Sequence, residues 1–205
     1  MIKNYRKIFI VSLLCLIPLI YSIPIYQSIP SLIPTHWDFN GNIDGYTSKK
    51  AFVFIAPIAS FLLNIIVSTF MYLDPRNIDN KAKLKDIYIV IIPVLLNILY
   101  LVSLLVSFNY DVNISMIVKI ILGLLFIILG NYTLGIKTPW TLNDDEIWNK
   151  TNKLGGKILF IIGFILIFSI AMKNNKGFLI LFMSSLSLLF IPVIYSYILY
   201  VKKNK

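Results

Sequence analysis

The sequence predicts an all-α, polytopic integral membrane protein with about six transmembrane helices. Of its 205 residues, 58% are hydrophobic and only 14% are charged, whereas soluble domains carry about 25% charged residues. The apolar residues form six blocks, most of them close to the roughly 20 residues that cross a bilayer. Polar connectors separate these blocks. We therefore expect a multi-pass protein of the cell membrane.

The first apolar block, residues 8–26, follows three basic residues and begins like a signal peptide. Its apolar part is longer than a typical signal-peptide core, contains Pro18 and Pro24, and lacks a small-x-small cleavage site. We interpret this block as a retained first span that is kinked at Pro18.

Residues 29–50, IPSLIPTHWDFNGNIDGYTSKK, are expected to form a loop outside the membrane. Proline, glycine and asparagine disfavour a lipid-facing helix, and Asn40-Gly41 and Asp44-Gly45 have turn chemistry. The chain's one histidine, His36, lies here beside Trp37. Imidazole and carboxylates could form an acid–base or metal-binding set, but the spacing H-x-D is a weak signal. A structural role in the loop is the favoured interpretation, followed by ligand contact.

The remaining spans are expected at residues 51–73, 87–108, 114–130, 158–172 and 177–200. Every acidic residue falls in a connector or at a span end, which weakens an ion-coupled transport mechanism, because such transporters place ionisable groups at mid-depth. Asn64 and Asn97 lie near mid-span, and we interpret them as interhelical hydrogen-bond partners. A transporter remains an alternative if these two side chains line a polar cavity.

The basic residues predict the orientation. With a cytoplasmic N-terminus, fourteen lysines and arginines lie on the inner side and five on the outer side, counting Lys119 as reaching outward. This distribution follows the positive-inside rule, so both termini are expected in the cytoplasm. The net charge of +10 is spread over short clusters, which indicates topology signals and contacts with membrane lipids rather than direct nucleic-acid binding.

Residues 131–156 form the polar inner segment around which the prediction is organised. Pro139 disfavours a continuing helix, Asn143 is a good N-cap with Glu146 three residues later, and acidic residues fill the first turn. We expect a short amphipathic helix on the inner membrane surface, anchored by Trp148. The pair Gly155-Gly156 is predicted to end this helix as a hinge before the fifth span.

No catalytic residue, metal or cofactor is expected. Cys15 is the one cysteine and lies in an apolar block, so no intramolecular disulfide is available. A membrane-embedded hydrolase would need a nucleophile–base pair or a metal within reach, and the single histidine lies on the other side from the inner segment. We therefore regard a hydrolase as the weakest alternative.

Two motifs resemble those of one known family. GIKTPWTLNDDEIWNKTNKLGGK resembles the signature of the SdpI-type immunity protein family, which has G-I-R-T-P-W-T-L, an acidic cap, W-x-K-T-H and L-G-G. The outer segment is similar to the pattern I-P-x-H-W-[ND]-x-x-G-x-x-D-x-x-x-x-K of that family's N-terminal domain. The motifs occur in the expected order in a chain with six predicted spans, so the resemblance covers nearly the full length.

The resemblance implies a non-enzymatic protein of the bacterial cell membrane that gives immunity to a secreted peptide toxin. In some members it also implies the capture of a cytoplasmic transcriptional repressor at the membrane. We expect residues 1–75 to form an N-terminal two-span unit with the outer loop and residues 76–205 a four-span unit with the inner loop. The predicted toxin-recognition residues of the outer loop are Pro34, His36, Trp37, Asn40, Gly41 and Asp44. The predicted signalling residues of the inner loop are Thr138, Pro139, Trp140, Thr141, Trp148, Thr151 and Gly155.

The sequence departs from the family pattern at three places. Lys137 stands where arginine is usual, which removes a bidentate donor fork. Asn152 stands where histidine is usual, and the segment before Gly135 is several residues shorter. All three lie on the predicted inner side, so they concern signalling to a repressor more than the membrane fold.

Overall fold

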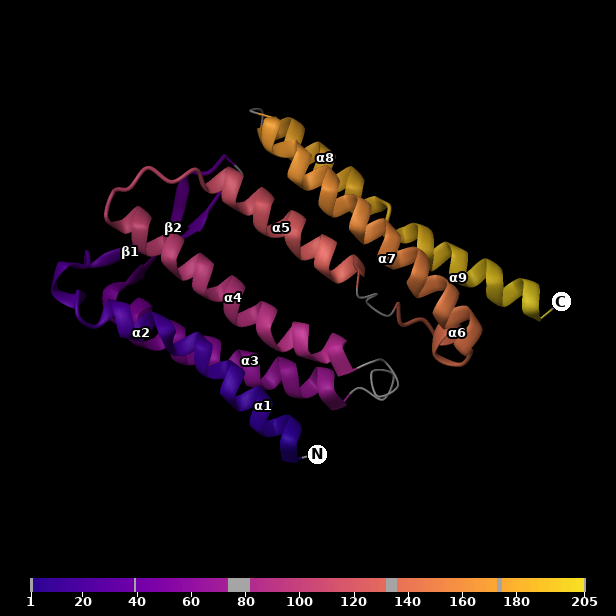
Figure 1. The fold of residues 1–205 in the computed structure, drawn as a ribbon. Coiled ribbons are helices and arrows are strands. Elements are labelled where there is room, and N and C mark those ends of the chain that lie inside the picture. The colour runs from indigo at the N-terminus through magenta and orange to yellow at the C-terminus, as the bar shows by residue number, and fades with distance from the viewer. Residues whose placement is uncertain (1, 39, 74–81, 132–135, 173–174, 205) are drawn as a thin grey trace. The chain divides into compact units, whose positions relative to one another are not determined.

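The structure is a computed structural model that describes residues 2–38, 40–73, 82–131, 136–172 and 175–204. The chain forms two compact units, Met1–Val112 and Asn113–Lys205, whose elements are drawn in Figure 1. The boundary between the compact units lies after the third predicted span, because α4 (Ala82–Ser107) packs with α1 (Ile2–Ser12) and α3 (Ala56–Leu73). The functional division at residues 75 and 76 stays a prediction.

Among its described residues, the first unit contains three apolar helical regions and one β-hairpin. Its elements are α1 (Ile2–Ser12), η1 (Leu13–Leu16), α2 (Ile17–Ser22), η2 (Tyr26–Ser28), β1 (Leu32–Trp37), β2 (Ile43–Ser48), η3 (Ala51–Ile55, a π-helical turn), α3 (Ala56–Leu73) and α4 (Ala82–Ser107).

The kink predicted at Pro18 is the 3₁₀ turn η1 between α1 and α2. Proline has no N–H, so it cannot donate to the carbonyl four residues earlier, which belongs to Leu14. Asn97 of α4 supplies a donor instead, since its Nδ2 lies 3.0 Å from the Leu14 carbonyl oxygen. Asn64 Nδ2 likewise donates to Ser12 Oγ at 2.9 Å. The prediction that both asparagines bond between helices is confirmed.

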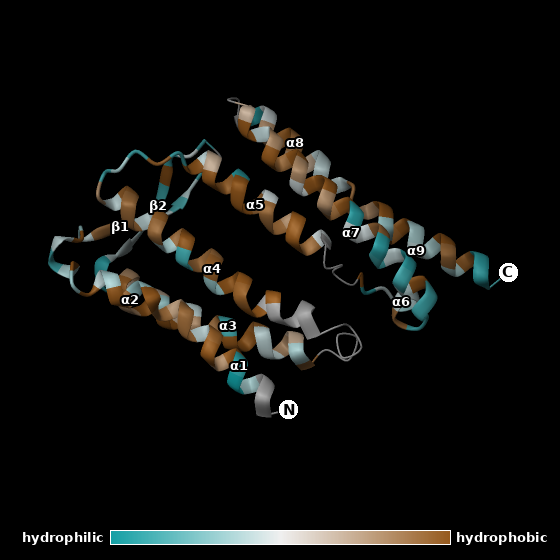
Figure 2. Ribbon diagram, viewed as in Figure 1, coloured by the Kyte–Doolittle hydropathy of each residue, from teal (hydrophilic) through white to brown (hydrophobic). Residues whose placement is uncertain are grey.

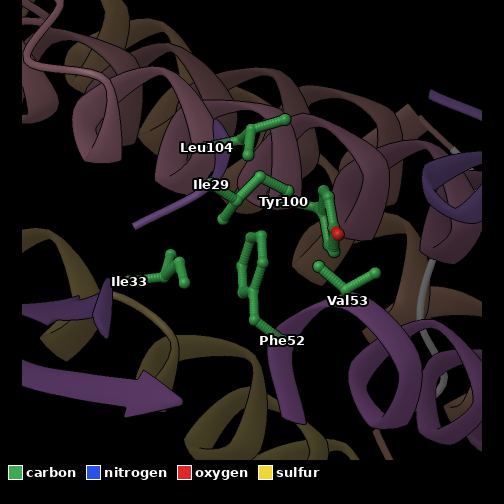
Figure 3. Packing of buried hydrophobic residues seen from close by; sticks show 6 residues of the cluster. All are labelled: Ile29, Ile33, Phe52, Val53, Tyr100 and Leu104. Atoms are coloured by element: carbon green, nitrogen blue, oxygen red, sulfur yellow. The ribbon is translucent and has the colours of Figure 1, made fainter. Parts of the chain in front are cut away.

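A hydrophobic cluster joins the hairpin to the helices of the first unit (Figure 3). Phe52 stacks on Tyr100 with ring centroids 4.1 Å apart, and the Tyr100 hydroxyl lies 2.9 Å from Ser22 Oγ. Ile33 is fully buried in this cluster, so strand β1 of the hairpin is packed against the helices. The six members of the cluster are Ile29, Ile33, Phe52, Val53, Tyr100 and Leu104.

The second unit contains α5 (Ile114–Asn131), α6 (Pro139–Leu142), α7 (Asp145–Phe168), η5 (Ser169–Ala171), α8 (Asn175–Ser187) and α9 (Phe190–Lys203). The last predicted span is interrupted between α8 and α9, where Pro192 cannot donate to the carbonyl of Leu188 and its ring crowds that carbonyl. Helix α7 runs without a break through Gly155 and Gly156. The predicted hinge and the predicted separate interfacial helix are therefore wrong.

Glycines bring α5 and α7 into backbone contact. A Cβ built on Gly163 would lie 2.6 Å from the Gly123 carbonyl oxygen and 2.7 Å from the Ile127 amide nitrogen. A Cβ on Gly130 would lie 2.6 Å from the Gly156 carbonyl oxygen. Small residues are common where helices pack closely in membranes. Lipid tails are as apolar as the side chains, so the helices associate through close van der Waals contact and not through the hydrophobic effect. Gly156 is thus a packing residue of the antiparallel pair α5–α7.

The apolar helices confirm the predicted all-α membrane fold. Within the described residues, five helices are long and apolar enough to cross a membrane, and Ile114–Gly130 is a shorter apolar helix. Figure 2 shows hydrophobic residues through the middle of the helices and hydrophilic ones around α6, the start of α7 and the end of α9. The five helices are Tyr5–Ser22, Ala51–Leu73, Ile89–Ser107, Asp145–Ala171 and Lys176–Lys203.

Candidate functional site

The predicted outer loop is an antiparallel β-hairpin, and the described residues of its tip are 38 and 40–42. Gly41 has φ +84°, so the turn predicted at Asn40-Gly41 is confirmed. Asp38 organises the tip, since its Oδ1 accepts hydrogen bonds from the amides of Asn40 and Asn42 at 2.8 Å each. The pKa of Asp38 is lowered, mainly by the hydrogen bond from the Asn42 side chain. Asp38 therefore has a structural role in the turn.

Two bulges in the hairpin bring His36 and Asp44 together. The register pairs Pro34 with Tyr46, His36 with Gly45 and Trp37 with Ile43, which leaves one extra residue on each strand. Bulges re-aim side chains, and here His36 Nδ1 lies 2.5 Å from Asp44 Oδ1. The side chains are 73% and 47% exposed respectively. The hairpin thus presents a paired imidazole and carboxylate to the surroundings.

The second predicted turn, at Asp44-Gly45, is wrong, because both residues lie within β2. The glycine has another purpose. A Cβ on Gly45 would lie 2.8 Å from the His36 Cβ across the hairpin, a distance that real Cβ atoms do not tolerate. Gly45 therefore makes room for His36 to reach Asp44.

The other predicted outer residues have different environments. Trp37 is half-buried, Asn40 is exposed and Pro34 is buried. Among the described residues, His36, Asp38 and Asp44 form no three-residue group that could hold a metal ion. Sequence reasoning missed Lys49, whose Nζ donates to the Tyr26 carbonyl oxygen at 3.0 Å and lies 4.9 Å from the centre of the Tyr26 ring. This contact fixes the base of the hairpin.

The T-P-W-T-L motif, which is predicted to lie on the inner side, forms the one-turn helix α6. Thr138 is its N-cap in a reciprocal capping box with Thr141, and Pro139 occupies the first turn, where its missing N–H costs nothing. The fully buried Thr141 also donates through Oγ1 to the Ile136 carbonyl oxygen at 2.7 Å. These bonds hold the motif in one compact turn.

Trp140 joins this turn to the C-terminal helix α9. Its indole Nε1 donates to Ser196 Oγ at 2.6 Å. Its ring centroid lies 5.4 Å from that of Tyr197 and 6.2 Å from that of Tyr200. The motif and the C-terminus therefore meet at one end of the second unit, a contact that the sequence did not indicate.

Asp144, and not the predicted Asn143, is the N-cap of α7. Asn143 already ends α6 in a helical conformation, whereas Asp144 is extended and accepts from the amides of Glu146 and Ile147 at 3.0 and 3.1 Å. Lys203 Nζ lies 2.7 Å from Asp144 Oδ2. The pKa of Asp144 is lowered, first by the Lys203 hydrogen bond and then by the amide of Ile147.

The predicted anchor Trp148 is 8% exposed and Thr151 is fully buried, so both face the protein interior. Gly155 faces Ile136, since an added Cβ would lie 3.0 Å from Ile136 Cδ1. Asn152, where the family pattern has histidine, accepts from the Ile136 amide at 2.8 Å. Asn152, which differs from the family pattern, thus fixes the backbone at Ile136, just before α6.

The chain is 32% identical to "Immunity protein SdpI" of Bacillus subtilis (strain 168), and the match covers 98% of each chain. It belongs to the SdpI/YfhL protein family. The profile of this family matches residues 127–196, which contain α6, α7, α8 and the first half of α9. A domain of unknown function (DUF1648) matches residues 13–61, which contain the hairpin. No solved structure matches the chain.

Proposed function

We propose that this member of the SdpI/YfhL family protects the bacterium that makes it against a secreted peptide toxin, and that it does so by binding and not by catalysis. The observation that carries the proposal is the full-length similarity to a relative named as an immunity protein. Helices long and apolar enough to cross a membrane suit a protein that meets a toxin at the cell membrane. The β-hairpin of the first unit is the proposed recognition element.

The hairpin suits recognition because it is both anchored and accessible. Its base is fixed by Lys49 and by the hydrophobic cluster under β1, while His36 and Asp44 are exposed. Binding to a preformed surface avoids part of the entropy cost of ordering a loop. Trp37 is the proposed aromatic anchor, since tryptophan is enriched among residues that dominate binding energy.

A survival assay tests the proposal. The wild-type chain, expressed in a toxin-sensitive bacterium, is expected to raise survival against the peptide encoded beside its gene, without cleavage products of that peptide accumulating. Trp37→Ala is expected to abolish protection at matched membrane levels, because truncating a binding hot spot costs about 2 kcal/mol or more. Tyr110→Ala is the control, since Tyr110 is a 63% exposed aromatic outside the hairpin. Full protection by Trp37→Ala would show that the hairpin is not the toxin site.

The inner motif is proposed to bind a cytoplasmic transcriptional repressor. Leu142 of α6 is 40% exposed beside the exposed acids Asp145 and Glu146, a surface that combines an apolar contact with charge. Leu142→Asp is expected to release the candidate repressor from sedimented membranes without loss of toxin protection. Phe160→Asp is the comparison variant, because Phe160 is 40% exposed within the apolar span of α7. This change is expected to lower the amount of the protein in the membrane. Equal co-sedimentation with Leu142→Asp and the wild type would exclude this surface.

A further inference from the structure

The two edges of the hairpin are unequal. On β1, Pro34 has no N–H to offer, and β1 packs against α4. Strand β2 has no proline, and its residues Ile43, Asp44, Tyr46 and Ser48 are exposed. Proteins commonly protect sheet edges because an unpaired edge is a template for another strand. Within the described residues of the first unit, Gly45–Ser48 carries neither a proline nor a charged side chain that would protect this edge.

The register shows which backbone groups the β2 edge presents. The Lys49 amide donates to the Ser31 carbonyl at 2.9 Å, so this pair is hydrogen-bonded across the hairpin. Antiparallel pairs alternate, which makes Ile33–Thr47 a hydrogen-bonded pair and Pro34–Tyr46 a non-hydrogen-bonded pair. Pro34 fits that position because no N–H is needed there. The N–H and C=O groups of Tyr46 and the N–H of Ser48 therefore point away from β1, whereas the Ser48 carbonyl belongs to the helical turn that begins at Lys49.

Acidic and basic residues lie at opposite ends of this edge. Residues 36–45 contain two carboxylates, Asp38 and Asp44, and no lysine or arginine, whereas Lys49 and Lys50 follow β2 at the other end. Between them Tyr46 is 57% exposed. An extended peptide with a basic residue near Asp44 and a carboxylate near Lys50 would match both ends of the edge, with an apolar side chain against Tyr46.

We propose that the peptide toxin binds as an added β-strand along the edge of β2, with main-chain hydrogen bonds to the N–H and C=O of Tyr46 and the N–H of Ser48, and a basic side chain at Asp44. The inference rests on the proposed function. Strand addition is a common way to bind extended peptides, in which main-chain bonds give affinity and alternate side chains give specificity. It gives a reason for the difference between the Tyr46 edge, which has no proline, and the opposite edge, which carries Pro34 and packs against α4.

An N-methyl scan of the peptide tests strand addition directly. The probe is a synthetic copy of the peptide against which the wild-type chain protects, with one backbone amide methylated at a time, and binding to the detergent-solubilised full chain is measured. Methylation removes a donor, and an added strand presents every second residue to β2. We expect alternate positions to lose about tenfold in affinity and the intervening positions to bind like the unmodified peptide, from the usual worth of hydrogen bonds.

Variants of Tyr46 test the same bonds from the side of the protein. Tyr46→Pro removes the outward N–H at a position whose partner is already proline, so the hairpin keeps its internal bonds. Tyr46→Val removes the ring but keeps the N–H. We expect Tyr46→Pro to bind the peptide about tenfold more weakly than Tyr46→Val. Thermal unfolding of both variants reports whether the hairpin is retained.

The outcomes separate this inference from the proposed function. Strand addition would be overturned if the chain protects and binds the peptide, but the affinity losses in the N-methyl scan show no two-residue period and both Tyr46 variants bind equally. The proposed immunity function would then still stand. Neither protection nor binding by the wild-type chain would overturn both. Tyr46→Cys adds a further check, because Cys15 is buried. A disulfide-linked dimer through position 46 that forms with or without the peptide would assign the edge to a second copy of the chain and overturn the inference.

Discussion

At the scale of single residues, lysines hold helix ends in both units. Lys49 donates to the Tyr26 carbonyl, and Lys119 donates to the Met172 carbonyl at 3.0 Å with its Nζ 4.8 Å from the centre of the Phe178 ring. A cation near the C-terminus of a helix is favourable. Lys119, which the topology prediction counts on the outer side, is only 3% exposed, because a carbonyl and an aromatic face are within its reach.

Asp144 gives the stability of the second unit a pH dependence. Its pKa is lowered from the ordinary value of 3.8, so folding favours the charged form. The stabilisation is complete above that ordinary value and is lost as the pH falls through the lower pKa of the folded state. We expect Asp144→Asn, which keeps an N-cap acceptor but cannot titrate, to unfold with a flatter dependence on pH between about 2 and 5.

The measurement is the thermal unfolding midpoint of the detergent-solubilised chain against pH. Lys203→Met is the companion variant, because Lys203 is the first cause of the lowered pKa of Asp144. It is expected to reduce the acid-induced loss of stability while leaving the amide bonds of the cap in place. Identical pH profiles for the wild type and Asp144→Asn would contradict this account.

In residues 29–50, the residue types predicted local turn geometry, but they did not predict which residues face each other across the hairpin. The sequence indicated a turn at Gly41, where positive φ is a property of the local chain. It placed a second turn at Asp44-Gly45, because glycine after aspartate has the same local signature. The need for Gly45 comes from the His36 Cβ on the facing strand, and that register is a property of the pair of strands.

At the scale of elements, the α5–α7 pair shows the same limit. Hydrophobic blocks predicted both spans, yet Gly155-Gly156 was interpreted as a hinge because local rules count glycine as a helix breaker. The structure uses Gly156 for contact with Gly130. In a membrane protein the close approach of two backbones outweighs the intrinsic preference of glycine, and the sequence of one helix does not show which neighbour it meets.

Two glycine substitutions in α7 are expected to differ sharply. Gly163→Ala would place a Cβ 2.6 Å from a backbone oxygen of α5, so the helices must separate, at a cost of about 1–3 kcal/mol or more. Gly155→Ala is the matched control, because its Cβ would meet the movable end of the Ile136 side chain at 3.0 Å. The thermal unfolding midpoint of each purified variant is the measurement. A larger loss for Gly155→Ala than for Gly163→Ala would contradict the packing assignment.

At the scale of the whole molecule, the distribution of basic residues predicts that both termini and the T-P-W-T-L motif are cytoplasmic. The ion pair between Lys203 and Asp144 places the C-terminus and this motif at the same end of the second unit, as that orientation requires.

Single-cysteine variants in a Cys15→Ser background test the orientation. Lys50→Cys and Lys150→Cys suit labelling because both positions are exposed, and loss of the exposed Lys150–Glu146 pair costs little. A membrane-impermeant maleimide is expected to label position 50 on intact cells and position 150 only after the cells are opened. Labelling of both positions from outside intact cells would show that position 150 lies outside the cell, contrary to the predicted orientation. The motif could then not meet a cytoplasmic partner.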